Sequence, residues 1–204
     1  MTETNYSIER DLMEARVMAE GLEDYLRQDE LYGSVDGWYS TDPQIPSLTI
    51  GGLLLRLSRL QRLESQMSSA QKATLTEIEA LHDIVRERLT GRYHERIVNE
   101  AGSRLRALEA FFADCEDDPE ACADAYLPEA QRRTIVEEIV HALKKYNLPV
   151  IDLDDTLRQR DTALRRYTKP APFVWSTDLQ TVYPQEKYWW LYVRPRERAV
   201  EGEM

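Results

Sequence analysis

Two Glu-x-x-His units, Glu79/His82 and Glu138/His141, have the clearest metal-binding spacing in the chain. Four-helix proteins that hold two iron or manganese ions use this spacing on two helices and add one Glu from each of the others. Every such side chain must point into the bundle interior. At about 100° per residue, His141 points nearly opposite the apolar stripe of its helix, and Glu138 lies well outside that stripe. His82 falls near the edge of its own stripe, with Glu79 beyond the edge. We therefore expect no metal here.

A second candidate is the acidic segment Ile151-Asp152-Leu153-Asp154-Asp155-Thr156-Leu157. These seven residues resemble the first motif of the haloacid-dehalogenase-like phosphotransferases. The resemblance implies that Asp152 is a nucleophile, that Asp154 handles protons, and that magnesium joins both to phosphate. In that family the motif opens a long parallel-sheet domain, whereas only 47 residues follow Leu157. The interpretation we favour is that Asp152, Asp154 and Thr156 cap and open a helix.

Cys115 and Cys122 bracket a run of acidic residues and Pro119. A disulfide that closes an acidic loop and a cation held by the carboxylates are two functional readings. The run lacks the glycine and the distal glutamate of an EF-hand, and two cysteines without a nearby His make a poor zinc site. We expect one or two buried thiols beside a solvated loop, and leave open whether they pair.

Two segments echo each other, each with Ser-Thr-Asp-x-Gln after aromatic residues: Trp38 to Gln44 and Trp175 to Gln180. Ser, Thr and Asp favour turns and caps, which explains this composition without any function. The alternative is a pocket for a small molecule, lined by Trp38, Tyr39 and Trp175 and by the turn that carries Asp152 and Asp154.

The formal net charge is −11, and its excess lies in two segments. Residues 1–46 carry 11 acids against 3 bases, and residues 113–130 carry 7 acids and no base. An acidic chain repels phosphate backbones, so we expect no nucleic-acid partner. Basic residues mix with aromatic ones at 158–167 and 187–198. We expect these to pair with acids of the same chain or of another subunit.

The longest apolar run, Leu53 to Leu55, is far too short to span a membrane. The N-terminus carries Glu3 and Glu9 with no apolar stretch behind them, so we expect no signal peptide. Two cysteines are too few for a disulfide scaffold at this length. A cytoplasmic location without a membrane partner is the simplest expectation.

The elements that must position these residues are amphipathic helices. Apolar steps of three and four predict helices over the following segments: Ser7 to about Leu31, Ser47 or Thr49 to about Met67, Ala70 to Phe112, Pro128 to Asn147, and 155–167. Gly91 either bends or ends the third of these, and both possibilities stay open. The segments 32–47 and 113–127 are expected to be an ordered loop and an acidic loop.

Beyond Pro170 the sequence turns aromatic. Phe173 to Trp175 and Lys187 to Val193 read as two strands. In the second strand Tyr188, Trp190 and Tyr192 would point one way, and the intervening Trp189, Leu191 and Val193 the other. Because both faces are apolar, the bundle, a partner or one of each must cover them.

The sequence thus predicts a mainly α fold. An up-and-down bundle of four to five helices spans 1–169, and an aromatic β-hairpin or arm spans 170–204. The leading hypothesis is a non-enzymatic interaction or assembly protein without a cofactor, in which Tyr188, Trp189, Trp190 and Tyr192 form a homodimer interface. The alternatives are a small-molecule-binding protein at Trp38, Tyr39, Trp175 and the Asp152/Asp154 turn, or a metal-dependent phosphate hydrolase centred on those two acids.

Overall fold

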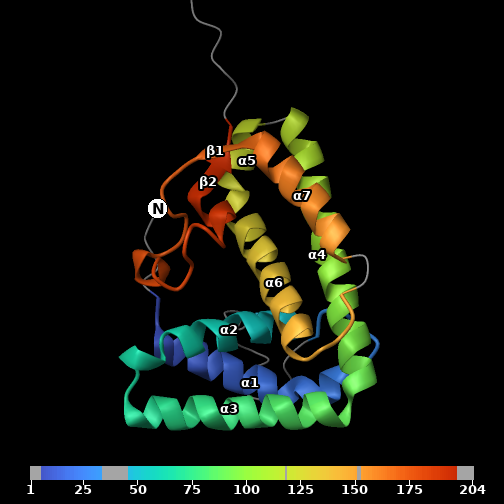
Figure 1. The fold of residues 1–204 in the computed structure, drawn as a ribbon, viewed down its shortest axis with the longest axis vertical. Coiled ribbons are helices and arrows are strands. Elements are labelled where there is room, and N and C mark those ends of the chain that lie inside the picture. Colours follow the sequence, from blue (N-terminus) through green and yellow to red (C-terminus); the bar gives the residue numbers. More distant parts are fainter. Residues whose placement is uncertain (1–5, 34–45, 118, 151–152, 197–204) are drawn as a thin grey trace, which may run out of the picture. The chain divides into compact units, whose positions relative to one another are not determined.

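The computed structural model describes residues 6–33, 46–117, 119–150 and 153–196. Within these ranges the chain forms seven α-helices and one two-stranded antiparallel sheet near its C-terminus (Figure 1). The predicted mainly α fold with a short C-terminal pair of strands is confirmed, with more helices than the four or five expected. No helix in these ranges is both long enough and apolar enough to cross a membrane.

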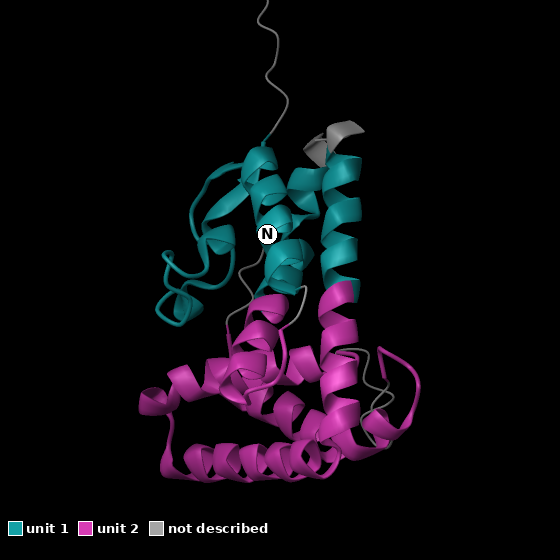
Figure 2. Cartoon of the chain, turned by 45° about the vertical axis from the view of Figure 1, so that its right-hand side comes forward, with its two compact units in different colours: residues 1–5, 103–134, 151–204 teal, residues 6–102, 135–150 magenta. Residues whose placement is uncertain are grey.

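The chain divides into two compact units (Figure 2). The helical unit comprises Tyr6–Gly102 and Ile135–Val150. The C-terminal unit comprises Ser103–Thr134 and Ile151–Met204, together with Met1–Asn5. Residues 170–196 therefore belong to the same unit as the helical segments that precede them, 103–134 and 153–169.

The first two helices of the helical unit begin where a hydroxyl side chain caps them. Ser7 Oγ accepts the Arg10 N–H at the start of α1 (Ile8–Arg27), and Thr49 Oγ1 accepts the Gly52 N–H at the start of α2 (Ile50–Arg62). Each cap satisfies one N–H group that has no partner inside its helix. A short 3-10 turn, η1 (Glu64–Gln66), follows α2.

The third helix, α3 (Ser69–Arg88), opens with a reciprocal capping box between Ser68 and Gln71. It ends at Arg88 with Leu89 as its C-cap, and α4 (Thr90–Asp117) begins at the residue after Leu89. The segment from 70 to 112 is thus two helices, and Gly91 lies in the first turn of the second one. The sequence left open whether Gly91 bends or ends this helix. The helix is instead interrupted at Leu89, two residues before that glycine.

Helix α1 packs against both α2 and α3 (Figure 1). The contact faces are the predicted apolar stripes, which are almost fully buried, for example at Met18, Leu22, Leu53 and Ile78. Such burial of leucine, isoleucine and methionine side chains contributes about 1.5–3 kcal/mol each and is the main source of stability of this layer.

The C-terminal unit combines helices with a small sheet. It contains the later part of α4, α5 (Pro119–Asp124), the first part of α6 (Tyr126–Lys145), and α7 (Leu153–Tyr167). Strand β1 (Thr168–Pro170) follows α7 directly and pairs with β2 (Val193–Pro195), so that Lys169 lies opposite Arg194. Two 3-10 turns, η2 (Thr177–Leu179) and η3 (Trp189–Tyr192), lie between the strands.

The predicted strands at 173–175 and 187–193 are wrong. Residues 189–192 form the 3-10 turn η3, and a turn does not alternate side chains between two faces. Tyr188, Trp190 and Leu191 are consequently all buried together. The preceding segment is bonded to this turn through its backbone: the Val174 N–H donates to the Leu191 carbonyl.

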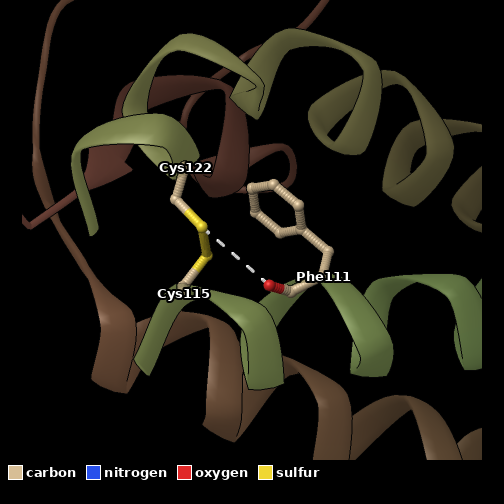
Figure 3. The surroundings of a disulfide bond; sticks show 3 residues. All are labelled: Phe111, Cys115 and Cys122. Atoms are coloured by element: carbon tan, nitrogen blue, oxygen red, sulfur yellow. Dashed lines mark hydrogen bonds between the residues drawn. A yellow bond between two sulfur atoms is a disulfide. The ribbon is translucent and has the colours of Figure 1, made fainter. Parts of the chain in front are cut away.

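Within the described residues, most of the acidic segment 113–127 is helical, so the prediction of a loop there is wrong. Helix α4 continues to Asp117, α5 covers Pro119–Asp124, and α6 starts at Tyr126, two residues before the predicted start at Pro128. Cys115 and Cys122 form a disulfide that joins α4 to α5, so the interpretation as free thiols is also wrong (Figure 3). Both cysteines are buried, and the Phe111 carbonyl lies 4.0 Å from the Cys122 sulfur.

Candidate functional site

A pocket in the helical unit lies between α2, α3 and the C-terminal end of α6. Its volume is about 190 Å³, somewhat more than the roughly 150 Å³ of an engineered cavity that holds benzene. Leu54 and Leu57 of α2 form an apolar part of its lining, and Ser58 and Gln61 of the same helix add polar groups. The pocket is thus large enough for a small organic molecule.

Helix α3 contributes Glu79, His82 and Asp83 to the lining. Their spacing of three and four residues places them on one face of the helix. The Gln61 amide donates to Glu79 Oε1 at 2.5 Å, which ties this wall to α2. Among the described residues, Glu79 has this neutral amide as a partner but no guanidinium or ammonium group.

The imidazole of His82 is held at both of its nitrogens. Nδ1 lies 3.1 Å from Asp83 Oδ1, and Nε2 lies 2.9 Å from the Tyr93 hydroxyl. His82 and Tyr93 are both buried. The hydrogen bond from His82 lowers the pKa of Asp83, and the charge of Arg86 lowers it further. Asp83 is therefore ionised at neutral pH, and the His82 ring is fixed in the wall.

Helix α6 contributes Glu138, His141 and Lys145, again at steps of three and four residues. Glu138 is only 2% exposed. Arg62 of α2 donates to Glu138 Oε1 at 3.2 Å, so the buried carboxylate is neutralised by a cation from another helix. His141 and Lys145 are exposed at the rim.

Tyr146 follows the last residue of α6 and completes the lining. The guanidinium carbon of Arg86 lies 4.1 Å from the centre of its ring. Burial raises the pKa of the Tyr146 hydroxyl, and the nearby charges of Asp83 and Glu79 act in the same direction. The side chain is therefore neutral at physiological pH, and its hydroxyl can donate a hydrogen bond.

The structure brings both Glu-x-x-His units to this one pocket. The helical-wheel expectation that Glu138 lies outside the buried face is wrong, because Arg62 makes burial of its carboxylate possible. His141 is exposed, as its position opposite the apolar stripe predicts. In the ranges 6–33, 46–117, 119–150 and 153–196, no group of three or more His, Cys, Asp or Glu side chains could hold a metal ion.

Of the other predicted ligand-binding residues, Trp38, Tyr39 and Asp152 lie outside the described residues. Asp154 lies in the first turn of α7 and is exposed. Trp175 is half-buried, and its ring packs edge-to-face on Tyr183 at a centroid distance of 5.0 Å.

The predicted interface aromatics form much of the core of the C-terminal unit. Tyr188 and Trp190 are each 1% exposed and Tyr192 is 9% exposed. The Trp190 indole N–H donates to Thr134 Oγ1 at 2.9 Å, and the Arg133 guanidinium carbon lies 3.8 Å from the centre of its ring. These side chains are covered by their own unit.

Trp189 is the member of this group that stays half-buried. The guanidinium carbon of Arg165, on α7, lies 3.6 Å from the centre of its ring. Arg133 pairs with Asp161, and Arg160 pairs with Glu109. The expected pairing with an acid of the same chain is confirmed for Arg160. Arg165 instead lies over an aromatic ring, which was not expected.

Sequence reasoning did not assign Ser58, Gln61, Asp83, Lys145 or Tyr146 to any site. One signal was available, since Asp83 and Lys145 each follow the Glu of a Glu-x-x-His unit at a spacing that keeps them on the same helix face. Gln61 and Ser58 are single polar residues on α2 and carry no such signal.

The chain matches none of the protein-family models, none of the curated proteins and none of the solved structures with which it was compared.

Proposed function

We propose that this chain is a non-enzymatic binding protein that holds a small polar molecule in the pocket between α2, α3 and α6. The observation that carries the proposal is the fixed polar wall of that pocket. Gln61 holds Glu79, Asp83 and Tyr93 hold His82, and Arg62 holds Glu138. A ligand gains affinity when the groups that bind it are already ordered, because less conformational entropy is lost on binding.

The same contacts favour binding over catalysis. Both nitrogens of His82 are engaged, one of them by a buried tyrosine, which leaves no free imidazole nitrogen for proton transfer to a ligand. Asp83 and Glu138 are each paired with an arginine. These groups are suited to orienting a ligand by hydrogen bonds and charge.

The test is a screen of small polar molecules against the isotope-labelled full chain, read by NMR at the pocket side chains and by the shift in melting temperature. Ser58→Met places a larger side chain in the pocket lining and should abolish binding of any hit. Ser65→Met is the matched control, since Ser65 is exposed and lies outside the lining. A hit that binds both variants as it binds the natural chain would contradict the proposal.

A second candidate function is self-association through the aromatic segment of the C-terminal unit, with a homodimer as the expected product. It is favoured by one observation: Phe173, Trp175 and Trp189 remain half-buried while their aromatic neighbours are covered. An isologous contact would bury their exposed edges.

This candidate is tested by light scattering on the full chain and on Trp189→Ser. A single substitution at Trp189 is preferred to a truncation before residue 170. The truncation would also remove Trp190, which lies in the core of the unit. A dimer that becomes monomeric in the variant, with an unchanged circular dichroism spectrum, supports self-association. A monomeric natural chain excludes it.

A further inference from the structure

We infer that the ligand of this pocket is a small zwitterion, a molecule with an ammonium group at one end and a carboxylate at the other. The inference rests on the proposed binding function and adds the chemical class of the ligand. It follows from which charges of the lining are already paired and which are not.

The α3 wall offers a place for the ammonium group. Asp83 is paired with Arg86 and His82, so its charge is compensated. The carboxylate of Glu79 is held by a neutral amide, which fixes its position without cancelling its charge. A carboxylate whose charge no neighbouring cation cancels is a favourable partner for an organic cation.

The α6 wall offers a place for the carboxylate group. His141 and Lys145 are four residues apart and therefore lie on one face of the helix. Within the described ranges neither makes a hydrogen bond or an ion pair inside the protein. The Lys145 Nζ atom lies 5.5 Å from the centre of the Tyr146 ring, so its charge is close to the pocket. Glu138 on the same helix is compensated by Arg62 and does not repel an anion strongly.

Charge balance selects a zwitterion over a simple ion. The three carboxylates of the lining are matched in number by Lys145 and by the two arginines that pair with Asp83 and Glu138. A ligand of a single sign would leave one of the two open charges, at Glu79 or at Lys145, without a partner. A volume of about 190 Å³ suits a molecule slightly larger than benzene.

The test is isothermal titration calorimetry of the full chain with three probes of similar length: 4-aminobutanoate, butane-1,4-diamine and butanedioate. Glycine and 6-aminohexanoate extend the zwitterion series to shorter and longer chains. We expect saturable binding of a zwitterion and much weaker binding of the diamine and the dicarboxylate. Glu79→Gln and Lys145→Gln should each weaken zwitterion binding by about 10-fold or more, the usual effect of losing a charge-assisted hydrogen bond.

Two variants serve as matched controls. Glu77→Gln changes an exposed acid on α3, and Lys144→Gln changes an exposed base on α6, and neither residue lines the pocket. Both should bind the zwitterion as the natural chain does. Circular dichroism of all four variants verifies that each one folds.

Other outcomes separate this inference from the proposed function. Diamine binding that is tighter than zwitterion binding and insensitive to Lys145→Gln would overturn the zwitterion and leave the binding function standing. Butanedioate binding that is tighter than zwitterion binding and insensitive to Glu79→Gln would show that the ligand is an anion. It too would overturn the zwitterion and leave the binding function standing. If no probe binds, the zwitterion is excluded, and the NMR screen with Ser58→Met decides the binding function by itself.

Discussion

The buried carboxylate of Glu100 accepts a hydrogen bond from the backbone N–H of Gly51 at 2.8 Å. Gly51 is the second residue of α2, where N–H groups have no acceptor within the helix. A carboxylate at this end of a helix also interacts favourably with the helix dipole. The approach is close because Gly51 has no side chain: a Cβ there would lie 2.5 Å from Glu100 Oε1 and 2.5 Å from Ile135 Cγ2.

Gly51→Ala should therefore lower the free energy of unfolding. Backbone and side chains must move to admit the methyl group, at a cost of about 1–3 kcal/mol that outweighs the gain in helix propensity. Urea denaturation followed by circular dichroism measures the difference. Gly91→Ala is the control, because Gly91 is also in the first turn of a helix but a Cβ there meets nothing within 4 Å. An equal effect of the two substitutions would contradict the close approach.

The ion pair between Glu14 and Arg56 joins α1 to α2 in the buried layer, with 2.6 Å between Glu14 Oε2 and Arg56 Nη2. Burial acts to raise the pKa of Glu14, but the guanidinium groups of Arg56 and Arg10 outweigh it and lower the pKa below its usual value. The folded pKa is thus lower than the unfolded one. The ionised carboxylate stabilises the fold above the unfolded pKa of about 4.3, and this contribution is lost as the pH falls through the folded value.

Glu14→Gln should therefore flatten the dependence of stability on pH in the acid range. As the pH falls from neutral to values below the pKa of an ordinary glutamate, we expect the natural chain to lose more stability than the variant. At neutral pH, Arg56→Met should be the more damaging change, by about 3–5 kcal/mol, because it leaves a buried carboxylate without its main partner. Urea unfolding at a series of pH values measures both effects. Parallel curves for the natural chain and Glu14→Gln would show that Glu14 titrates alike in the folded and unfolded chains.

The disulfide between Cys115 and Cys122 closes a short loop between the end of α4 and α5, at a sequence separation of seven. In the chain-entropy description, closing a loop of this length restricts the unfolded chain and stabilises the fold by about 2–3 kcal/mol. The double variant Cys115→Ser/Cys122→Ser should lose that amount and become insensitive to reducing agents. Thermal unfolding with and without a reductant measures both.

The control for the disulfide is alkylation of the natural chain under denaturing conditions, followed by mass spectrometry. Two alkylated thiols in the oxidised sample would show that the pair does not form. The same measurement on protein taken directly from cells tests the expected cytoplasmic location, because reducing compartments keep such pairs open.

The first three helices could be predicted from sequence because their determinants are local. Apolar steps of three and four and the hydroxyl groups of Ser7, Thr49 and Ser68 mark their faces and starts. The segment 187–193 could not be predicted in this way. From Tyr188 to Val193 every residue is apolar or aromatic, so no polar alternation distinguishes a strand from a turn. A 3-10 turn buries Tyr188, Trp190 and Leu191 as effectively as a covered strand would.

The pocket depends on partners that are distant in sequence. Glu138 is buried because of Arg62, 76 positions away, and Glu79 is fixed by Gln61, 18 positions away. A helical wheel treats each helix alone and places an unpaired carboxylate in solvent. Only the packing of α2 against its neighbours reveals that the charge of Glu138 is compensated and that Glu79 is held by a neutral amide.

Trp190 lies in the core of the C-terminal unit. Its indole N–H donates to Thr134 Oγ1, whose own hydroxyl donates to the Ala130 carbonyl. Thr134→Val keeps the shape of the side chain but leaves the buried indole N–H without this acceptor, at a cost of about 1–3 kcal/mol. Thr134→Ser keeps the hydroxyl and should cost less. In the background of Trp190→Phe, which has no N–H to satisfy, Thr134→Val should cost less than it does in the natural chain, and the double-mutant cycle measures this coupling. A coupling of zero would show that the hydrogen bond contributes nothing, so that Trp190 acts through packing alone.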